Sequence, residues 1–427
     1  MTERRSRNAL VALVLTALAI SLSPNAARSQ DAPVDNCLSC HRALGDARLS
    51  APAQAYDQDV HAAKGFTCAA CHGGDATAAG FEGMDPAKGF VATPLRRRIP
   101  DFCGRCHSDA PFMRQYNPSL RVDQVTEYST SVHGRRLAQL ADTLVAVCTS
   151  CHPAHAIRPP ADPQSSVYPL RVADTCGACH ADSDYMAPYP IPTDQLDKYR
   201  RSIHWEMMSV EGDLSAPTCN DCHGNHGAAP PGISWVGNVC GQCHSVMAEN
   251  FSQSRHAETF AMLGVPGCAT CHQNHEVVRA TDAMLGLEDG AVCARCHSAG
   301  DAGGEAAATM RAQIDSLNRA FAAADSILLR AERAGMEVSQ ALVDLGGANN
   351  SGIQARAAMH AFDVAAMTEK IDEGLGVTAQ AYRRGQQALG ELQFRRTGLA
   401  VSVTIILMLI VGLLLRIRLI ERQEPTA

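Results

Sequence analysis

Two uncharged runs mark the two ends of this chain of 427 residues. The first, Ala9 to Leu22, follows three arginines and precedes small residues up to Ser29, the pattern of a secretory signal peptide over residues 1–29. The second, Thr397 to Leu415, has 19 uncharged residues and as a helix would be about 28 Å long, enough to cross a bilayer core. Because the first run is too short to span well, we predict one transmembrane helix, over residues 397–415, with a tail at 416–427.

The region before that span, residues 301–394, has the hydrophobic pattern of packed helices. Its apolar side chains recur at alternating spacings of three and four residues, which places them on one face of a helix. This stripe consists of Ile314, Leu317, Phe321, Ala324 and Leu328.

Two glycine-containing places predict interruptions of these helices, at Gly335 and at the stretch "GGANNSG", residues 346–352. A second helical face then carries Ile353, Ala357, His360 and Val364. We interpret residues 301–394 as an α-helical stalk or docking domain that continues as helix into the membrane span. A homodimer through this region stays open as an alternative.

Eighteen cysteines lie between the two ends, and every one belongs to a Cys-x-x-Cys-His unit. The nine cysteine pairs are Cys37 and Cys40, Cys68 and Cys71, Cys103 and Cys106, Cys148 and Cys151, Cys176 and Cys179, Cys219 and Cys222, Cys240 and Cys243, Cys268 and Cys271, and Cys293 and Cys296. The histidines that complete the units are His41, His72, His107, His152, His180, His223, His244, His272 and His297.

This repeated unit has the spacing of a covalent haem anchor. Two cysteines three positions apart reach the two vinyl groups of one haem, and the adjacent histidine becomes an axial ligand of its iron. A disulfide framework does not require the histidine, and zinc sites would not need it next to every cysteine pair. We therefore predict nine covalently bound c-type haems, each named below by its first cysteine, with the nine adjacent histidines as proximal ligands.

The composition indicates that these haems form the core of their own domain. Only 5% of the residues are aromatic, and the nine units follow one another at roughly one per 30 residues, too short a length of chain for a separate apolar core around each. We place this haem domain at residues 30–300.

A second set of histidines recurs at fixed places in repeated modules. Each module has an upstream histidine, a Cys-x-x-Cys-His-x-x-His and a plain Cys-x-x-Cys-His, and internal repetition of this kind indicates duplication. A histidine three residues after a proximal ligand lies on the wrong side of its own haem, so we expect it to reach a neighbouring haem. The candidate distal ligands are His61, His133, His155, His204, His226, His256, His275 and His360. His360 fits a core histidine of the helical region equally well.

The chain has 17 histidines, so at least one of the nine irons lacks a distal histidine. The first modules are the least complete, because Asp75 stands where the others have the additional histidine. That iron could be ligated by Met84 or left open for a substrate. Met113 and Met186 occupy equivalent repeat positions and are more simply interpreted as packing residues.

At these motifs the sequence resembles the doubled-CxxCH multihaem c-type cytochromes, a family of extracytoplasmic electron carriers. The resemblance covers roughly residues 36–300. It implies a haem chain held by loops and short helices that carries electrons between a quinol-linked membrane donor and another acceptor. The expected fold class is mainly α with extensive irregular structure, built around stacked haems and followed by an α-helical bundle or hairpin and the transmembrane helix.

Two functions from different classes fit these motifs. The first is a membrane-anchored electron-transfer subunit, and the second is a multihaem reductase of a small nitrogen or sulfur oxyanion at the iron without a distal histidine. Related catalytic enzymes can use a proximal lysine, but this chain has no Cys-x-x-Cys-Lys and only four lysines, which favours electron transfer. A filament subunit is disfavoured because the anchor would tether every copy.

Export and charge decide the expected location and partners. A cleaved signal peptide puts the haem domain on the periplasmic face of the bacterial inner membrane, with the C-terminal tail inside. Removing residues 1–29 takes away four arginines and one glutamate and changes the formal net charge from −7 to −10. Such a surface makes nucleic acid an unsuitable partner, so we expect redox proteins, including an integral membrane quinol-oxidising subunit.

Overall fold

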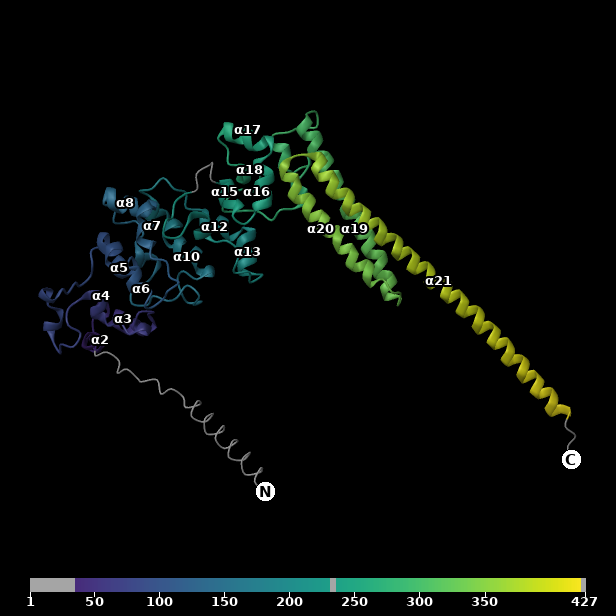
Figure 1. Cartoon of the computed structure of the whole chain (residues 1–427), viewed down its shortest axis with the longest axis horizontal. Helices are drawn as coiled ribbons and strands as arrows, with labels where there is room; N and C mark the ends of the chain where they lie inside the picture. The colour runs from purple at the N-terminus through teal and green to yellow at the C-terminus, as the bar shows by residue number, and fades with distance from the viewer. Residues whose placement is uncertain (1–34, 231–235, 424–427) are drawn as a thin grey trace, which may run out of the picture. The chain divides into compact units, whose positions relative to one another are not determined.

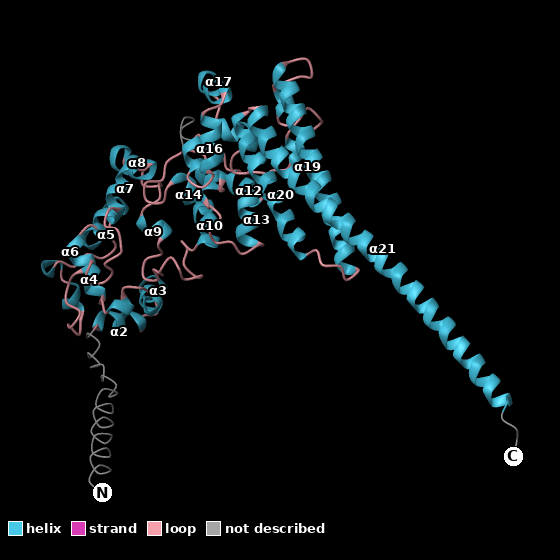
Figure 2. Ribbon diagram, turned by 45° about the vertical axis from the view of Figure 1, so that its right-hand side comes forward, coloured by secondary structure: helices cyan, strands magenta, loops and turns pink. Residues whose placement is uncertain are grey.

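The computed structural model describes residues 35–230 and 236–423, and the predicted signal peptide lies outside them. Helices and loops make up the described residues, and no strand occurs among them (Figure 2). The mainly α fold class predicted from the sequence is thus confirmed. The chain forms two compact units, residues 1–175 and 176–427, each of which is described by itself.

The first unit consists of short helices joined by long loops. Its helices are α2 (Asn36–Arg42), α3 (Ala47–Ala55), α4 (Cys68–His72), α5 (Ile99–His107), α6 (Ala110–Met113), α7 (Gln124–Thr130), α8 (Val132–Leu140) and α9 (Cys148–Cys151), and α10 (Pro169–His180) continues into the second unit. Within the described residues this unit has a small cluster of buried apolar side chains. It consists of Leu137, Val145 and Val147, with Ile99 and Tyr128 packed against them. The helices of this unit are thus joined by loops around a small apolar core.

The second unit begins in the same style, with helices of four to nine residues. These are α11 (Ser183–Met186), α12 (Gln195–Arg200), α13 (Ile203–Ser209), α14 (Cys219–His223), α15 (Val236–Gly241), α16 (Ser245–Ser252), α17 (Arg255–Leu263) and α18 (Gly267–His272).

Most Cys-x-x-Cys-His units lie in one helical turn, as in α2, α4, α14 and α18. In a helix, residues three and four apart point to the same side. The two cysteines and the histidine therefore face one haem position. Local helical geometry thus brings the three side chains of such an anchor to one side.

Three long helices complete the second unit: α19 (Ala302–Arg333), α20 (Ser339–Ala358) and α21 (Val364–Gln423). They pack side by side as an antiparallel bundle (Figure 1). Of the predicted stripe, Ile314, Leu317, Ala324 and Leu328 are buried, and Phe321 is partly buried against the same core. These side chains contact α20 and α21, so the bundle has the ordinary apolar core that the haem region lacks.

One predicted interruption is wrong. Gly335 does follow the end of α19, with a φ of 77° that favours glycine, but the "GGANNSG" stretch lies inside the continuous helix α20. Ala348, Ser351 and Gly352 of this stretch face the bundle, where small side chains let the helices approach closely. Across from this stretch, a Cβ on Gly374 of α21 would lie 2.8 Å from the Leu317 side chain and 3.2 Å from Cβ of Ser351, so tertiary packing offsets the poor helix propensity of the stretch.

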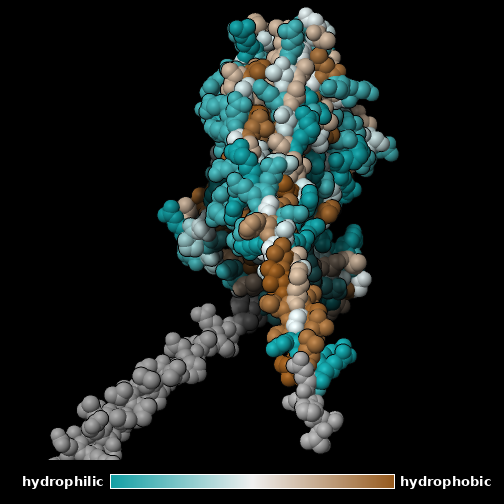
Figure 3. Space-filling view, turned by 90° about the vertical axis from the view of Figure 1, so that its right-hand side faces the viewer, coloured by the Kyte–Doolittle hydropathy of each residue, from teal (hydrophilic) through white to brown (hydrophobic). Residues whose placement is uncertain are grey.

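Helix α21 runs 60 residues without a break, from the bundle through the predicted span. It is long and apolar enough to cross a membrane, and its most apolar 18-residue window has no residue buried by the rest of the protein. Figure 3 shows this apolar band on the end of the helix beyond the bundle. A helix that exposes only apolar side chains over this length is compatible with a bilayer anchor.

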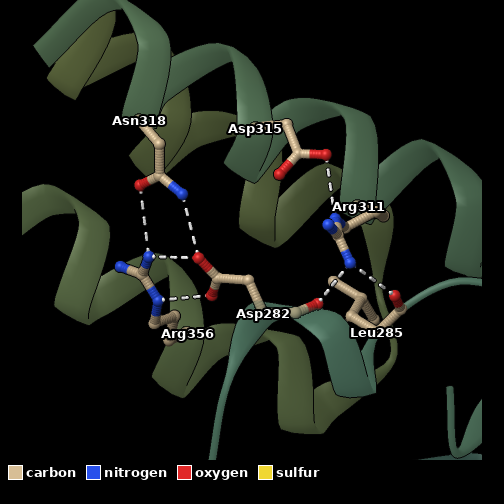
Figure 4. Close-up of polar contacts among 6 residues, drawn as sticks. All are labelled: Asp282, Leu285, Arg311, Asp315, Asn318 and Arg356. Atoms are coloured by element: carbon tan, nitrogen blue, oxygen red, sulfur yellow. Dashed lines mark hydrogen bonds and ion pairs between the residues drawn. The ribbon is translucent and has the colours of Figure 1, made fainter. Parts of the chain in front are cut away.

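A charged cluster fastens the loop at Asp282 to the bundle (Figure 4). Arg356 of α20 donates from Nε and Nη2 to the two carboxylate oxygens of Asp282, at 2.8 and 2.7 Å, and Asn318 of α19 donates to the same carboxylate. Arg311 of α19 donates to the carbonyl oxygens of Asp282 and Leu285. This bidentate pair therefore connects both helices to a loop between two haem anchors.

We expect Asp282→Asn to destabilise the second unit by roughly 1 kcal/mol, because the pair is bidentate but partly open to solvent. The Arg356 hydrogen bond holds the pKa of Asp282 below its usual range. A carboxylate with a lowered pKa stabilises the fold above its unfolded pKa of about 3.9, and this stabilisation is lost as the pH falls further. Thermal unfolding should show a larger difference between wild type and variant at pH 7 than at pH 3.

Candidate haem iron sites

At least six of the nine proximal histidines face a second histidine ring. The centroid separations are 6.1 Å for His61 and His107, 6.0 Å for His72 and His155, 6.4 Å for His204 and His244, 5.9 Å for His223 and His275, 5.9 Å for His256 and His297, and 6.2 Å for His272 and His360. Each pair joins one proximal histidine to one candidate distal histidine.

These separations fit an iron between the two rings. An imidazole nitrogen binds a transition metal at about 2.0–2.1 Å, so centroid separations of 5.9 to 6.4 Å leave room for one iron that both histidines would hold. The angle between ring planes varies from 11° to 87° among the pairs, while the separation stays nearly constant. Ordinary aromatic contacts vary in distance with orientation, whereas two ligands of one metal keep their distance at any angle.

Hydrogen bonds orient several of these rings. The Nδ1 atom of His72 lies 2.8 Å from the Val91 carbonyl oxygen, that of His223 lies 3.2 Å from the Ala229 carbonyl, and that of His360 lies 3.0 Å from the Arg356 carbonyl. A carbonyl oxygen can only accept, so Nδ1 carries the proton. The lone pair of Nε2 is then free for a metal, the usual arrangement of a histidine ligand.

In two histidines the partner of Nδ1 is a carboxylate instead of a carbonyl oxygen. His61 Nδ1 lies 2.8 Å from Asp59 Oδ1, and His297 Nδ1 lies 3.0 Å from Asp301 Oδ1. Asp59 is buried, yet hydrogen bonds from His61 and Ile157 outweigh that burial and lower the pKa of its carboxyl group. Asp59 therefore stays ionised beside the ring of a candidate iron ligand.

Burial keeps the distal rings neutral. It lowers the pKa of His155, His204, His275 and His360, and the facing histidine lowers the pKa further for the first three. The neutral imidazole is the form that coordinates a metal. These rings therefore need no deprotonation at neutral pH.

The additional histidine of each module reaches backwards along the chain. His155 faces His72, and His275 faces His223, each the proximal ligand of the preceding module. Both have a positive φ, 68° and 52°, which is uncommon for a residue with a Cβ and marks a conformation that the surroundings impose. The ring contacts of His155 and His275 are thus with histidines of other units.

The upstream histidine of a module faces the second haem anchor of that module, as His204 does with His244 and His256 with His297. Backbone hydrogen bonds fix this arrangement. The amide of Val60 donates to the Ile157 carbonyl at 2.8 Å, and that of Ile203 donates to the Val277 carbonyl at 2.9 Å. Each bond joins the residue before an upstream histidine to the second residue after an additional histidine.

His360 takes the place that the additional histidine of a following module would have, opposite the first anchor of the last module. It lies in the single turn η9 (Met359–Ala361) between α20 and α21, and its ring faces His272. The side chain of Asn250 donates to the Ala357 carbonyl at 2.9 Å and fastens this turn to α16. The helical bundle therefore contributes a side chain to a haem site.

His41 differs from these six proximal histidines. All 17 histidines of the sequence lie within the described residues, and none of their rings is in contact with that of His41, whose Nδ1 lies 3.3 Å from the Leu49 carbonyl oxygen. Of the other predicted ligands, His133 lies in α8, His152 follows α9, His180 ends α10 and His226 follows α14.

The methionines and Asp75 have distinct surroundings. Met113 and Met186 are buried, as expected of packing residues, whereas Met84 is partly exposed at the end of a short turn. Asp75, at the position of the missing histidine, accepts from Thr77 and pairs with Lys88 at 3.1 Å. Asp75 thus fixes its own loop.

The cysteines of consecutive units lie close together. Cys103 contacts Cys148, Cys176 contacts Cys219, and Cys240 contacts Cys268 through their sulfur atoms. All eighteen are free of disulfide bonds, and burial raises the pKa of Cys68 to about 12. No group of three or more His, Cys, Asp or Glu side chains that could hold a metal ion occurs within residues 35–230 and 236–423.

The family comparison agrees with the chemistry of these sites. Residues 214–298 match the cytochrome c3 family, a segment that holds the anchors of the Cys219, Cys240, Cys268 and Cys293 haems. No curated protein and no solved structure matches the chain. The match supports a multihaem c-type cytochrome with covalently bound haems, without singling out the doubled-CxxCH family.

Proposed function

We propose that this protein is a membrane-anchored nine-haem cytochrome that transfers electrons from a quinol-linked membrane donor to another extracytoplasmic acceptor. The six histidine pairs with nearly equal separations carry this proposal. The order of the repeats leaves His133 and His226 for the remaining module haems, at Cys148 and Cys176. Eight of the nine irons then have two histidine ligands.

Two histidines per iron suit electron transfer better than catalysis. The haem supplies an iron that accepts and releases one electron while it keeps both ligands. Nδ1 hydrogen bonds hold five of the paired rings, those of His61, His72, His223, His297 and His360, so little has to move at these rings when the charge changes. Contacts between cysteines of consecutive anchors hold neighbouring haems close, which gives electrons a path along the chain.

Coulometric reduction of the purified holoprotein tests this function. We expect uptake of nine electrons per chain over a broad range of potentials, because the ligand surroundings differ from haem to haem. Uptake of four electrons, confined to the segment that matches the cytochrome c3 family, would contradict the proposal. A visible spectrum recorded before and after one full cycle serves as the control for damage.

The apolar end of α21 is expected to anchor the protein. A chain that ends after Phe394 keeps the packing of α19, α20 and α21, since Leu392 is the last residue against the bundle core. We expect this variant to leave the membrane fraction for the soluble periplasmic fraction with an unchanged visible spectrum. Retention in the membrane would show that another contact holds the protein there.

A second candidate function rests on His41, the proximal histidine that no other histidine faces. In this alternative the Cys37 haem reduces a small nitrogen or sulfur oxyanion at its open position, and the other haems deliver electrons to it. Cyanide added to the oxidised holoprotein should then bind one iron per chain and change its electron paramagnetic resonance signal. Binding that appears only in Met84→Leu would instead identify Met84 as the sixth ligand and leave electron transfer as the function.

A further inference from the structure

Four upstream histidines follow the same three-residue pattern, with one substitution. The residue two positions before the histidine is serine in three modules and aspartate in the first. The four segments are Asp59-Val60-His61, Ser131-Val132-His133, Ser202-Ile203-His204 and Ser254-Arg255-His256.

These four positions are structurally equivalent. Each residue is buried, with at most 7% of its surface exposed, and each has an extended backbone, with φ between −65° and −84° and ψ between 137° and 163°. A difference in side-chain chemistry among them therefore acts at one common place relative to the distal histidine.

The three serine side chains accept hydrogen bonds from the backbone. The Oγ atoms of Ser131, Ser202 and Ser254 accept from the amides of Gly134, Trp205 and Ala257, which caps the helix that carries the histidine. Within the part of the chain that the structure describes, none of these three hydroxyl groups is hydrogen-bonded to a histidine ring. They set the start of the helix and leave the ring to other contacts.

Asp59 instead forms a hydrogen bond with the ring of His61. Its Oδ1 accepts from the backbone amide of His61 at 2.9 Å and lies 2.8 Å from Nδ1 of the same residue. Its Oδ2 accepts from the amide of Ile157 at 2.8 Å, two residues after His155. One carboxylate thus holds the segments that carry the distal ligands of two haems, at Cys68 and Cys103.

His256, which follows Ser254, has no carboxylate beside its ring. Its Nδ1 atom is buried and has no hydrogen-bond partner in the described structure. At equivalent positions of two modules, one candidate distal histidine, His61, therefore has a carboxylate at Nδ1, and the other, His256, has no partner at Nδ1.

We propose that Asp59 lowers the reduction potential of the Cys103 haem by drawing the Nδ1 proton of His61 and placing a negative charge beside the ligand. A more basic imidazole is a stronger donor to iron, and a nearby negative charge favours the ferric form, so both effects act in the same direction. Asp59 is thereby a tuning residue, which acts on the iron through His61.

This inference rests on the proposed haem chain. In that chain the Cys103 haem is a low-potential step near the N-terminal end. Asp301 gives the proximal His297 of the Cys293 haem a similar partner, near the end of the haem domain that leads to the bundle. The carboxylates thus create differences in potential along the chain.

Asp59→Asn tests the inference, because asparagine carries no charge and its single Oδ1 can still accept from the amide of His61, although its NH2 group cannot accept from Ile157. Potentiometric titration followed by electron paramagnetic resonance should show one low-spin haem with a raised potential and eight unchanged haems. Asp57→Asn is the matched control, since Asp57 is an exposed carboxylate two residues away that pairs with Arg42. It should move no potential appreciably.

Unchanged potentials in Asp59→Asn, or a haem that becomes high-spin, would overturn the tuning role, the second result by showing that Asp59 only positions its ligand. Ser254→Asp gives an independent test by adding a carboxylate beside the unpartnered Nδ1 of His256. One potential should fall in this variant, and no change would count against the inference. If the wild type lacks low-spin haems with two histidine ligands, the proposed function itself fails, and that result is read before either variant.

Discussion

Replacing His360 by alanine is expected to convert the Cys268 haem from low spin to high spin while leaving the other eight unchanged. His360 faces His272, with 6.2 Å between the ring centroids. Loss of this ring would remove one of two strong ligands from that iron. Electron paramagnetic resonance of the oxidised holoprotein should show one new high-spin signal and the loss of one low-spin signal.

Chemical rescue provides the control for the His360 experiment. Free imidazole can enter the space left by the side chain, so its addition to His360→Ala should restore the low-spin signal. A spectrum of His360→Ala identical to that of the wild type would contradict the assignment and make His360 an ordinary core residue of the bundle. A high-spin signal at several haems would indicate general unfolding of the last module.

Removing both anchors of the same haem, in the double variant Cys268→Ala with Cys271→Ala, is expected to have the largest effect. A buried haem excludes several hundred Å² of apolar surface from water, which at about 25 cal/mol per Å² is worth on the order of 10 kcal/mol. The loops around α15 to α18 contain few buried apolar side chains of their own. We expect eight haems per chain, eight electrons in coulometry and early thermal unfolding of this region.

The residues between the two cysteines supply the control for the double variant. Ala269→Ser with Thr270→Ser changes the same helical turn without touching the thioether positions, so nine haems and normal stability are expected. A double cysteine variant that still binds nine haems and unfolds like the wild type would show that the Cys268 unit is not a haem anchor.

The sequence could predict the haem anchors because their chemistry is local. Two thioether bonds and one axial ligand require cysteines and histidine within a single helical turn, so the spacing alone identifies them. The apolar stripe of α19 was predictable for a similar reason, since Ile314 and Leu328 fall on one face of any helix that includes them.

The pairing of ligands could not be predicted fully, because it depends on how distant segments fold together. The sequence indicated that His155 and His275 reach a neighbouring haem, but not which one. It left His360 undecided, since the turn between α20 and α21 faces His272 only once the bundle has packed against α16. A pattern in the sequence, serine or aspartate two residues before each upstream histidine, could have drawn attention to Asp59.

The wrong prediction for residues 346–352 has the same origin. Glycine and asparagine are poor helix formers in isolation, and the sequence alone does not show that Ser351 and Gly352 face Leu317 and α21. Close packing of small side chains stabilises this segment as helix. Helix propensity was therefore a weaker guide there than tertiary contact.

The most direct test of the account is a haem count on the purified holoprotein, combined with its electron paramagnetic resonance spectrum. We predict nine covalently bound haems per chain, of which eight are low-spin with two histidine ligands and one, at Cys37, differs. Fewer than nine covalent haems, or several high-spin irons in the untreated protein, would contradict the account. Fewer than nine haems would show that some Cys-x-x-Cys-His units are not haem anchors. Several high-spin irons would show that the histidine pairs on which the proposed function rests do not ligate iron.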